Sequence, residues 1–216
     1  MADIKLKVHE FFVSIQGEGV HAGRPMHFIR LSGCNLKCVY CDIEEHESGT
    51  FLSLNEITAR VSDPDLLPIF ITGGEPLIQR EVLTLTTKLL ADNREVHLET
   101  NGSLDLSGVS EEVFKSIDVK TPGSGSPDSF LESNLEYITG KDEIKFIITS
   151  QDDFKWGVKK VRDWGILSFT SNVIFQPAWG IVDPKDLAEW AKSCTLPVRM
   201  GLQIHKYIWG PDVKGV

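Results

Sequence analysis

Short apolar segments rich in Ile, Val and Phe recur along the chain, with mixed polar and apolar sequence between them. Segments of this kind are typical of strands that are covered on both faces. Alternation of such strands with helical sequence indicates an α/β fold with a parallel sheet and right-handed crossovers. We predict strands at Met26–Leu31, Leu67–Thr72, Val96–Thr100, Ser116–Lys120, Glu143–Thr149, Asn172–Gln176 and Arg199–Ile204.

The segments between the predicted strands carry helix signals. Ser53 can cap a helix, and Glu56 completes a capping box. Apolar residues at helical spacing run along Gln79–Ala91, and Asp183 followed by proline predicts a helix that ends at Ser193. About six strand–helix units are too few for a closed barrel of eight, so we predict an open, partial (β/α) barrel.

The composition is that of an ordinary globular domain, with 41% hydrophobic and 25% charged residues among 216. We therefore expect residues 1–216 to form one domain. No apolar run is long enough to span a membrane, and the polar N-terminus does not resemble a signal peptide. A net charge of −9 without a cluster of Lys and Arg argues against direct nucleic-acid binding and favours a small-molecule substrate.

Three of the four cysteines are grouped at Cys34, Cys38 and Cys41. A 4Fe–4S cluster normally takes four cysteine ligands, so three ligands leave one iron open to a reactant. The spacing resembles that of radical S-adenosylmethionine enzymes, in which the open iron binds the methionine part of the cofactor. The alternative is a non-enzymatic zinc module, which would need a fourth ligand nearby, and Cys194 is remote in sequence. Grouped thiols that carry such a cluster indicate a reducing, cytoplasmic compartment.

Glycine-rich and polar segments follow the predicted strands, where (β/α) barrels place their functional groups. Thr72–Pro76, with the sequence TGGEP, has glycines that let the backbone approach a polar ligand; a tight turn is the alternative. Glu99 ends the third predicted strand and can accept hydrogen bonds from ribose hydroxyls. Asp118 and Lys120 end the fourth, and Lys120 can pair with a carboxylate; for both segments a strand-end turn is the alternative.

Another polar loop, Ile15–Gly19, precedes the cysteines and has the sequence IQGEG. Its carboxylate and amide groups suit the donor and acceptor edge of a guanine-like heterocycle. Arg30, on the strand that leads to the cysteines, can bind a substrate carboxylate through two parallel hydrogen bonds. From these residues alone, a solvated turn and a surface arginine remain alternatives.

Four segments together resemble the 7-carboxy-7-deazaguanine synthase family of the radical S-adenosylmethionine superfamily: Ser14–Gly19, Arg30–Asp42, Thr72–Pro76 and Leu202–Lys206. The resemblance implies a homodimer with a modified (β/α)6 partial barrel of the radical S-adenosylmethionine type. It implies conversion of 6-carboxy-5,6,7,8-tetrahydropterin to 7-carboxy-7-deazaguanine with loss of ammonia, in the pathway to queuosine or archaeosine in tRNA. An electron donor such as flavodoxin or ferredoxin would reduce the cluster.

The resemblance also implies roles for individual residues, with the hard chemistry carried by a 5′-deoxyadenosyl radical that is released from the cofactor. Cys34, Cys38 and Cys41 would ligate the cluster. The residues expected at the S-adenosylmethionine site are Tyr40, Asp42, Gly74, Glu75, Glu99, Asp118 and Lys120. The residues expected to hold the pterin are Ile15, Gln16, Gly17, Glu18, Arg30, Thr72 and His205.

One position departs from the family pattern. Relatives usually carry Thr two residues after the last cluster cysteine, where its hydroxyl helps to ligate a substrate-bound Mg²⁺, but this chain has Ile43. Glu44 and Glu45 follow, and because carboxylates suit Mg²⁺, one of them or water can take the place of the hydroxyl. The magnesium ligand stays open, as do two other functions: activation of a glycyl-radical enzyme, and radical chemistry on another small molecule.

Overall fold

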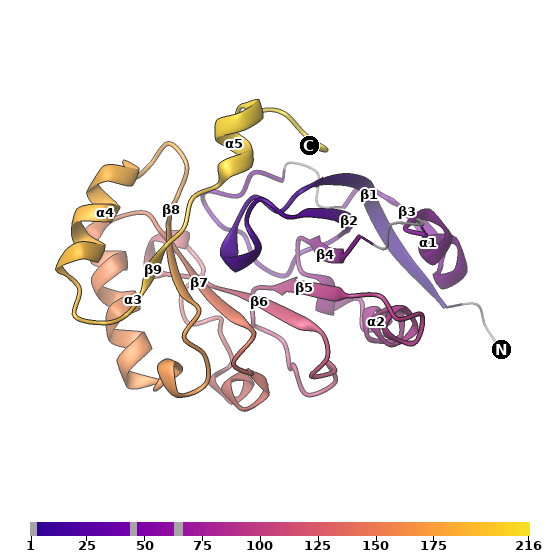
Figure 1. Ribbon diagram of the computed structural model, residues 1–216, viewed down its shortest axis with the longest axis horizontal. Coiled ribbons are helices and arrows are strands. Elements are labelled where there is room, and N and C mark those ends of the chain that lie inside the picture. The colour runs from indigo at the N-terminus through magenta and orange to yellow at the C-terminus, as the bar shows by residue number, and fades with distance from the viewer. Residues whose placement is uncertain (1–3, 44–46, 63–66) are drawn as a thin grey trace.

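The computed structural model describes residues 4–43, 47–62 and 67–216. Their strands form one sheet in the order β3-β1-β2-β4-β5-β6-β7-β8-β9. Neighbours from β2 to β9 run parallel, whereas β1 is antiparallel to β2 and β3. The sheet curves but stays open, with β3 and β9 as its outer strands (Figure 1), so the predicted partial barrel is confirmed. The bounds are β1 Lys5–Ile15, β2 Pro25–Leu31, β3 Thr50–Ser53, β4 Ile69–Gly73, β5 Val96–Thr100, β6 Phe114–Val119, β7 Glu143–Ile148, β8 Val173–Pro177 and β9 Arg199–Met200.

Helices α1 to α4 lie along the outside of the curved sheet, and α5 lies with the C-terminus at the opposite side (Figure 1). The capping box of Ser53 and Glu56 is confirmed at the start of α1, and Asp183 caps α4 as predicted. No helix within the described ranges is both long and apolar enough to cross a membrane. The α-helices are α1 Leu54–Arg60, α2 Val82–Ala91, α3 Gln151–Asp163, α4 Pro184–Ser193 and α5 Ile204–Trp209; the 3-10 turns are η1 Gly19–His21, η2 Pro76–Ile78, η3 Pro122–Ser124, η4 Glu132–Tyr137 and η5 Ile166–Ser168.

The two faces of the sheet have different partners. Successive side chains of a strand point to opposite faces. Ile29 on β2 and Ile71 on β4 accordingly join the large core beneath the helices, whereas Phe28 and Phe70 form a smaller cluster on the inner face. Each fully buried side chain of this size contributes about 1.5–3 kcal/mol to folding. Burial on both faces explains why the parallel strands read as continuous apolar runs.

Near the two ends of the sheet, the predicted strands differ from the observed ones. The prediction that Arg199–Ile204 is a strand is wrong beyond Met200, because β9 pairs with β8 through Arg199 and Met200 and the chain then turns away. Ile204 instead begins α5, where its N–H donates to the Gly17 carbonyl oxygen at 2.9 Å. β1 had no predicted counterpart, since its polar residues interrupt the apolar run of a strand that is only partly covered.

The helix predicted at Gln79–Ala91 begins three residues later, at Val82. Gln79 is used elsewhere: its amide nitrogen donates to the Lys7 and Ser32 carbonyl oxygens, and its amide oxygen accepts from the Lys7 N–H at 2.7 Å. The side chain thereby fixes β1 against the loop that leads to the cysteines. A helical position for Gln79 would forfeit these bonds.

Candidate active site

A cavity of about 650 Å³ lies at the carboxyl ends of the parallel strands. Its residues come from most of the chain, from His9 on β1 to Val216 at the C-terminus. It brings together all of the sequence-predicted site residues except Glu75. The predicted residues that line it are Ile15, Gln16, Gly17, Glu18, Arg30, Cys34, Cys38, Tyr40, Cys41, Asp42, Thr72, Gly74, Glu99, Asp118, Lys120 and His205.

The three clustered cysteines share one end of this cavity. All are thiols rather than disulfides; Cys34 and Cys38 are half-buried and Cys41 is exposed. Burial raises the pKa of the Cys34 and Cys38 thiols. The Leu36 N–H points at Cys34 Sγ over 3.5 Å, a contact that in cluster proteins tunes the metal-bound sulfur.

The donor set at this end of the cavity suits an iron–sulfur cluster. Thiolates are the usual ligands of four-iron clusters, and the three thiols of this loop line one cavity. Three thiolates would hold three irons and leave the fourth open to a ligand in the cavity.

The glycine pair after β4 packs against the cysteine loop. A Cβ on Gly74 would lie 2.2 Å from the Gly33 carbonyl oxygen and 2.5 Å from Cys34 Cβ, so only glycine permits this approach. The Glu75 N–H also donates to the Gly33 oxygen, at 2.9 Å. The second glycine of TGGEP therefore fixes the position of the first cluster cysteine.

Glu75 lies behind the cavity wall and not in the cavity. Its carboxylate accepts from the Asn101 N–H at 2.7 Å, the Leu77 N–H at 3.0 Å and the Thr100 hydroxyl at 2.9 Å, and its side chain is fully buried. Burial raises the pKa of this carboxyl, whereas the hydrogen bonds lower it. The structure thus places Glu75 as a brace between the loops after β4 and β5.

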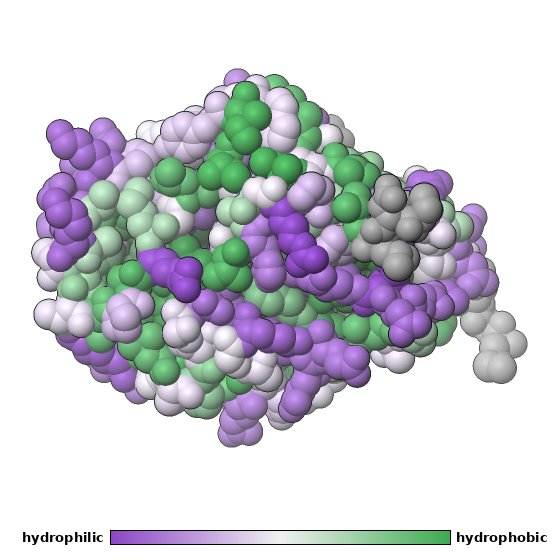
Figure 2. Space-filling model, in the orientation of Figure 1, coloured by the Kyte–Doolittle hydropathy of each residue, from purple (hydrophilic) through white to green (hydrophobic). Residues whose placement is uncertain are grey.

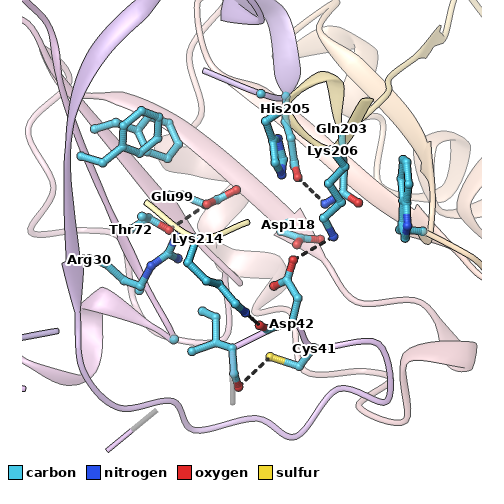
Figure 3. Close-up of a pocket in the computed structure, with 18 of the residues that line it drawn as sticks. Arg30, Cys41, Asp42, Thr72, Glu99, Asp118, Gln203, His205, Lys206 and Lys214 are labelled. Atoms are coloured by element: carbon cyan, nitrogen blue, oxygen red, sulfur yellow. Dashed lines mark hydrogen bonds and ion pairs between the residues drawn. The ribbon is translucent and has the colours of Figure 1, made fainter. Parts of the chain in front are cut away.

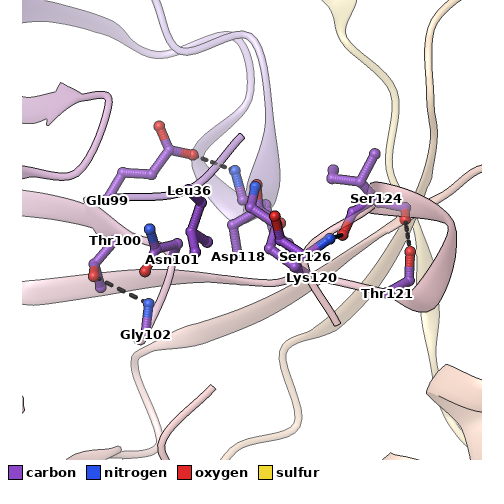
Figure 4. Close-up of polar contacts among 12 residues, drawn as sticks. Leu36, Glu99, Thr100, Asn101, Gly102, Asp118, Lys120, Thr121, Ser124 and Ser126 are labelled. Atoms are coloured by element: carbon purple, nitrogen blue, oxygen red, sulfur yellow. Dashed lines mark hydrogen bonds and ion pairs between the residues drawn. The ribbon is translucent and has the colours of Figure 1, made fainter. Parts of the chain in front are cut away.

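Asp118, near the end of β6, and Lys120, just beyond this strand, face the cavity next to Glu99 on β5 (Figure 4). Their ion pair measures 2.7 Å, and Lys120 Nζ lies 5.8 Å from the centre of the Tyr40 ring. Burial lowers the pKa of Lys120, but the neighbouring acidic groups Asp118, Tyr40 and Cys38 together outweigh burial and raise that pKa above its ordinary value. The second carboxylate oxygen of Asp118, Oδ1, is buried without a partner in the described structure, which leaves an acceptor for a ligand hydroxyl or amine.

The predicted heterocycle loop meets the start of α5 at the other end of the cavity. The Gln203 amide donates to Glu18 Oε1 at 2.8 Å, and Gln16 Oε1 accepts from the Glu18 N–H at 3.1 Å. A Cβ on Gly17 would lie 1.8 Å from Nδ1 of His205, so any other residue at this position would displace the His205 ring. Figure 3 shows His205 and Gln203 across the cavity from Arg30 and Cys41.

Arg30 carries a partner that the sequence did not reveal. Its Nε donates to Glu10 Oε1 at 2.7 Å, and both side chains are about one-quarter exposed. β1 and β2 pair Glu10 directly with Arg30 across the sheet. The carboxylate fixes one edge of the guanidinium and leaves its terminal N–H groups available to a second anion in the cavity.

The C-terminal residues 211–216 also line the cavity, next to Asp42 (Figure 3). Lys206 on α5 pairs with Asp42 Oδ2 at 2.9 Å, and Lys214 Nζ donates to the Asp42 carbonyl oxygen at 2.8 Å. Two lysines from the end of the chain therefore hold the residue that follows the last cysteine. Ile43 lines the cavity too, whereas Glu44 and Glu45, the alternative magnesium ligands, lie outside the described residues.

Sequence reasoning also missed Lys145 on β7. It is 1% exposed and pairs with Glu18 at 2.9 Å and, through a second short contact, with Glu99. A lysine in the middle of the buried segment Glu143–Ile148 was the available signal, because charged residues are almost never fully buried unless they are paired.

Comparison with known proteins agrees with this geometry. The model of the radical SAM superfamily matches residues 28–191. A 7-carboxy-7-deazaguanine synthase from Koribacter versatilis is 40% identical over 98% of this chain and 100% of its own. Its counterpart from Chlorobaculum tepidum is 40% identical over 98% and 97%, respectively.

Solved structures show the same fold. QueE from Escherichia coli superposes with a TM-score of 0.71 over 92% of this chain and 93% of its own, at 21% identity. The fold, the three-cysteine loop and the near full-length matches lead to one assignment. The chain belongs to the radical SAM superfamily and, within it, to the family of the 7-carboxy-7-deazaguanine synthases.

Proposed function

We propose that this protein converts 6-carboxy-5,6,7,8-tetrahydropterin to 7-carboxy-7-deazaguanine with loss of ammonia, as a radical S-adenosylmethionine lyase. The supporting observation is the single cavity that unites the three-thiol loop with Glu18 and Arg30. A carboxylate that can accept from a guanine-like edge and a guanidinium that can clamp a carboxylate match the two ends of this substrate. We further propose that residues 1–216 act as one domain, since residues from both ends of the chain line the cavity.

At the cofactor end, Cys34, Cys38 and Cys41 would hold the cluster. When bound, the cluster and S-adenosylmethionine supply a 5′-deoxyadenosyl radical that abstracts hydrogen. The backbone at Gly74 and the side chains of Tyr40, Asp42, Glu99, Asp118 and Lys120 would orient the cofactor. Glu75 would act indirectly, by fixing the loops that carry Gly74 and Asn101.

At the substrate end, the Glu18 carboxylate would accept from the amino and ring N–H groups of the pterin. Ile15, Gln16 and Gly17 would contribute mainly backbone groups, and Thr72 and His205 would complete the wall. Arg30, with one edge fixed by Glu10, would bind the substrate carboxylate and so place the adjoining ring carbon for hydrogen abstraction. The C-terminal residues 211–216 would exclude water from the cavity.

Three further features of the proposal concern partners and location. The exposed Cys41 and the 71% exposed Val39 put the cluster loop within reach of an electron donor such as flavodoxin or ferredoxin. The exposed Tyr207, Ile208 and Trp209, in the apolar surface over α5 (Figure 2), suit a homodimer contact. Four thiols without a disulfide suit a reducing, cytoplasmic compartment.

The test is anaerobic reconstitution with iron and sulfide, followed by incubation with S-adenosylmethionine, dithionite and the carboxy-pterin. We expect 7-carboxy-7-deazaguanine and ammonia in equal amounts, measured by liquid chromatography with mass spectrometry and by an enzymatic ammonia assay. Formation of 5′-deoxyadenosine without the deazapurine, at saturating pterin, would overturn the proposed substrate while leaving the superfamily chemistry intact.

A further inference from the structure

Lys145 links the two ends of the cavity. It lies on β7, is 1% exposed and does not line the cavity itself. Its Nζ lies 2.9 Å from Glu18 Oε2 and makes a shorter ion pair with Glu99 Oε1. Glu18 and Glu99 both line the cavity, so the lysine holds two ligand-facing carboxylates from behind.

Each carboxylate is fixed at both of its oxygens. Glu18 Oε1 accepts from the Gln203 amide at 2.8 Å, and Glu99 Oε2 accepts from the Thr72 hydroxyl at 2.9 Å. Burial of Glu18 raises its pKa, but the Lys145 charge and the hydrogen bonds that the carboxylate accepts together outweigh burial and lower the pKa to about 2. Because removal of one partner of a buried pair leaves an uncompensated charge, the triad holds together only as a unit.

β7 anchors the heterocycle loop at a second point as well. Residues 143 and 145 point to the same face of the strand. Glu143 accepts from the Val20 N–H at 2.7 Å and from the Ser116 hydroxyl at 2.7 Å. One strand therefore fixes the loop on either side of Gly19, and through Lys145 it ties that loop to the end of β5.

We propose that Lys145 is a positioning residue that couples pterin recognition at Glu18 to cofactor binding at Glu99. The inference rests on the proposed function, which places the pterin at Glu18 and the cofactor at Glu99. Coupling between sites is reciprocal. A change on the Glu99 side should therefore alter pterin affinity, and a change on the Glu18 side should alter the affinity for S-adenosylmethionine.

The chain offers a matched control in a second buried lysine. Lys115, on β6 of the same sheet, is fully buried and pairs with Asp142 at 3.1 Å. Neither residue lines the cavity. Lys115→Met and Lys145→Met therefore remove the same group from the same kind of environment, and only the second disturbs carboxylates that face a ligand.

The experiment uses the reconstituted, oxidised holoenzyme, in which no turnover occurs, and measures binding of the carboxy-pterin by anaerobic isothermal titration calorimetry with S-adenosylmethionine present. We expect Lys145→Met to bind the pterin about tenfold more weakly or worse, with wild-type iron content. In the reduced enzyme, the Lys145→Met variant should release more 5′-deoxyadenosine per molecule of 7-carboxy-7-deazaguanine formed. Lys115→Met should lower the melting temperature but keep pterin affinity and this ratio at the wild-type values.

Glu99→Gln serves as the second variant if Lys145→Met does not fold. Gln has the shape of Glu and lacks its charge, and its amide oxygen can still accept a hydrogen bond from Lys145. This variant should weaken pterin binding severalfold even without S-adenosylmethionine. Unchanged pterin affinity in the folded Lys145→Met protein, or in Glu99→Gln where the former fails to fold, would overturn the coupling. Equal effects of Lys115→Met and Lys145→Met would overturn it too. Failure of the wild-type protein to bind or convert the pterin would instead overturn the proposed function, and the coupling with it.

Discussion

The two ends of the cavity are built in different ways. The cofactor end is the more local of the two, since Cys34, Cys38 and Cys41 lie on one loop and short segments at the carboxyl ends of β4, β5 and β6 complete it. The substrate end joins segments that are remote in sequence, for example Glu18 and Gln203, which are 185 residues apart and hydrogen-bonded at 2.8 Å. A contiguous motif can be read from a sequence, whereas a remote pair becomes visible only when the chain is folded.

The largest effect that this contrast predicts concerns the cysteine loop. Replacement of Cys34, Cys38 or Cys41 by Ala should abolish cleavage of S-adenosylmethionine, because two thiolates cannot retain the cluster. Iron and sulfide content and 5′-deoxyadenosine formation measure the loss. Cys194→Ala is the control and should retain both, since Cys194 follows α4 and does not line the cavity. Loss of the cluster in a folded Cys194→Ala protein would contradict the three-ligand assignment.

A smaller effect, confined to the substrate end, is expected for Arg30→Ala. Loss of the guanidinium leaves a substrate carboxylate unpaired, at a cost of about 2–5 kcal/mol. The KM for the pterin should rise or turnover should fall accordingly, while 5′-deoxyadenosine formation without pterin stays at the wild-type rate. Steady-state kinetics and the uncoupled reaction separate these quantities.

The matched control for Arg30→Ala is Arg24→Ala. Arg24 also pairs with a carboxylate, Glu95 at 2.6 Å, but it does not line the cavity. Its loss should leave both activities unchanged. If Arg30→Ala depressed the coupled and uncoupled reactions equally at normal iron content, Arg30 would belong to the cofactor end or to the fold.

The third prediction concerns His97 on β5. Its side chain lies on the inner face of the sheet but does not line the cavity, so its ionisation should change the stability of the whole fold and not of one end of the cavity. Burial lowers the pKa of His97 from 6.5 to about 4, although the Glu95 carboxylate raises it; His21 and Arg24 are the other charged groups nearby. Between these two values the unfolded chain binds a proton that the folded protein excludes. Stability should therefore fall by about 2 kcal/mol between pH 7 and pH 5 on account of this residue.

The measurement compares thermal or urea unfolding of the wild type and His97→Phe at pH 7 and pH 5. Phe suits the site because the imidazole lies 4.7 Å from the ring of Phe114 and 6.2 Å from that of Phe70. The variant should lose less stability on acidification than the wild type. Equal losses in both proteins would show that His97 is not the group responsible.

The smallest effect is expected at Ile43. A hydrocarbon side chain there removes the hydroxyl that would help to hold Mg²⁺, so Ile43→Thr should strengthen stimulation by Mg²⁺ severalfold at most without changing the iron content. Turnover against magnesium concentration, after removal of contaminating metal, gives the comparison. Matching curves with strong stimulation in both proteins would show that another group fills the role, and Glu44 and Glu45 would be next to mutate.

The sequence by itself determined the parallel α/β architecture, the cluster loop and the family. Each of these rests on local information: apolar runs such as Val96–Thr100, the capping box at Ser53, and the spacing of Cys34, Cys38 and Cys41. The predicted site residues, with the exception of Glu75, also share one cavity, because parallel strands deliver their carboxyl ends to the same edge of the sheet.

Only the tertiary structure decided which partner each charge has. It buried Glu75 behind the wall, paired Arg30 with Glu10, and placed Lys145 between Glu18 and Glu99. In the folded chain β9 also ends at Met200, and the N–H of Ile204 at the start of α5 donates to the Gly17 carbonyl oxygen. These outcomes depend on cross-strand register and on the free-energy cost of burying a charge without its counterion, and neither is encoded in any short stretch of sequence.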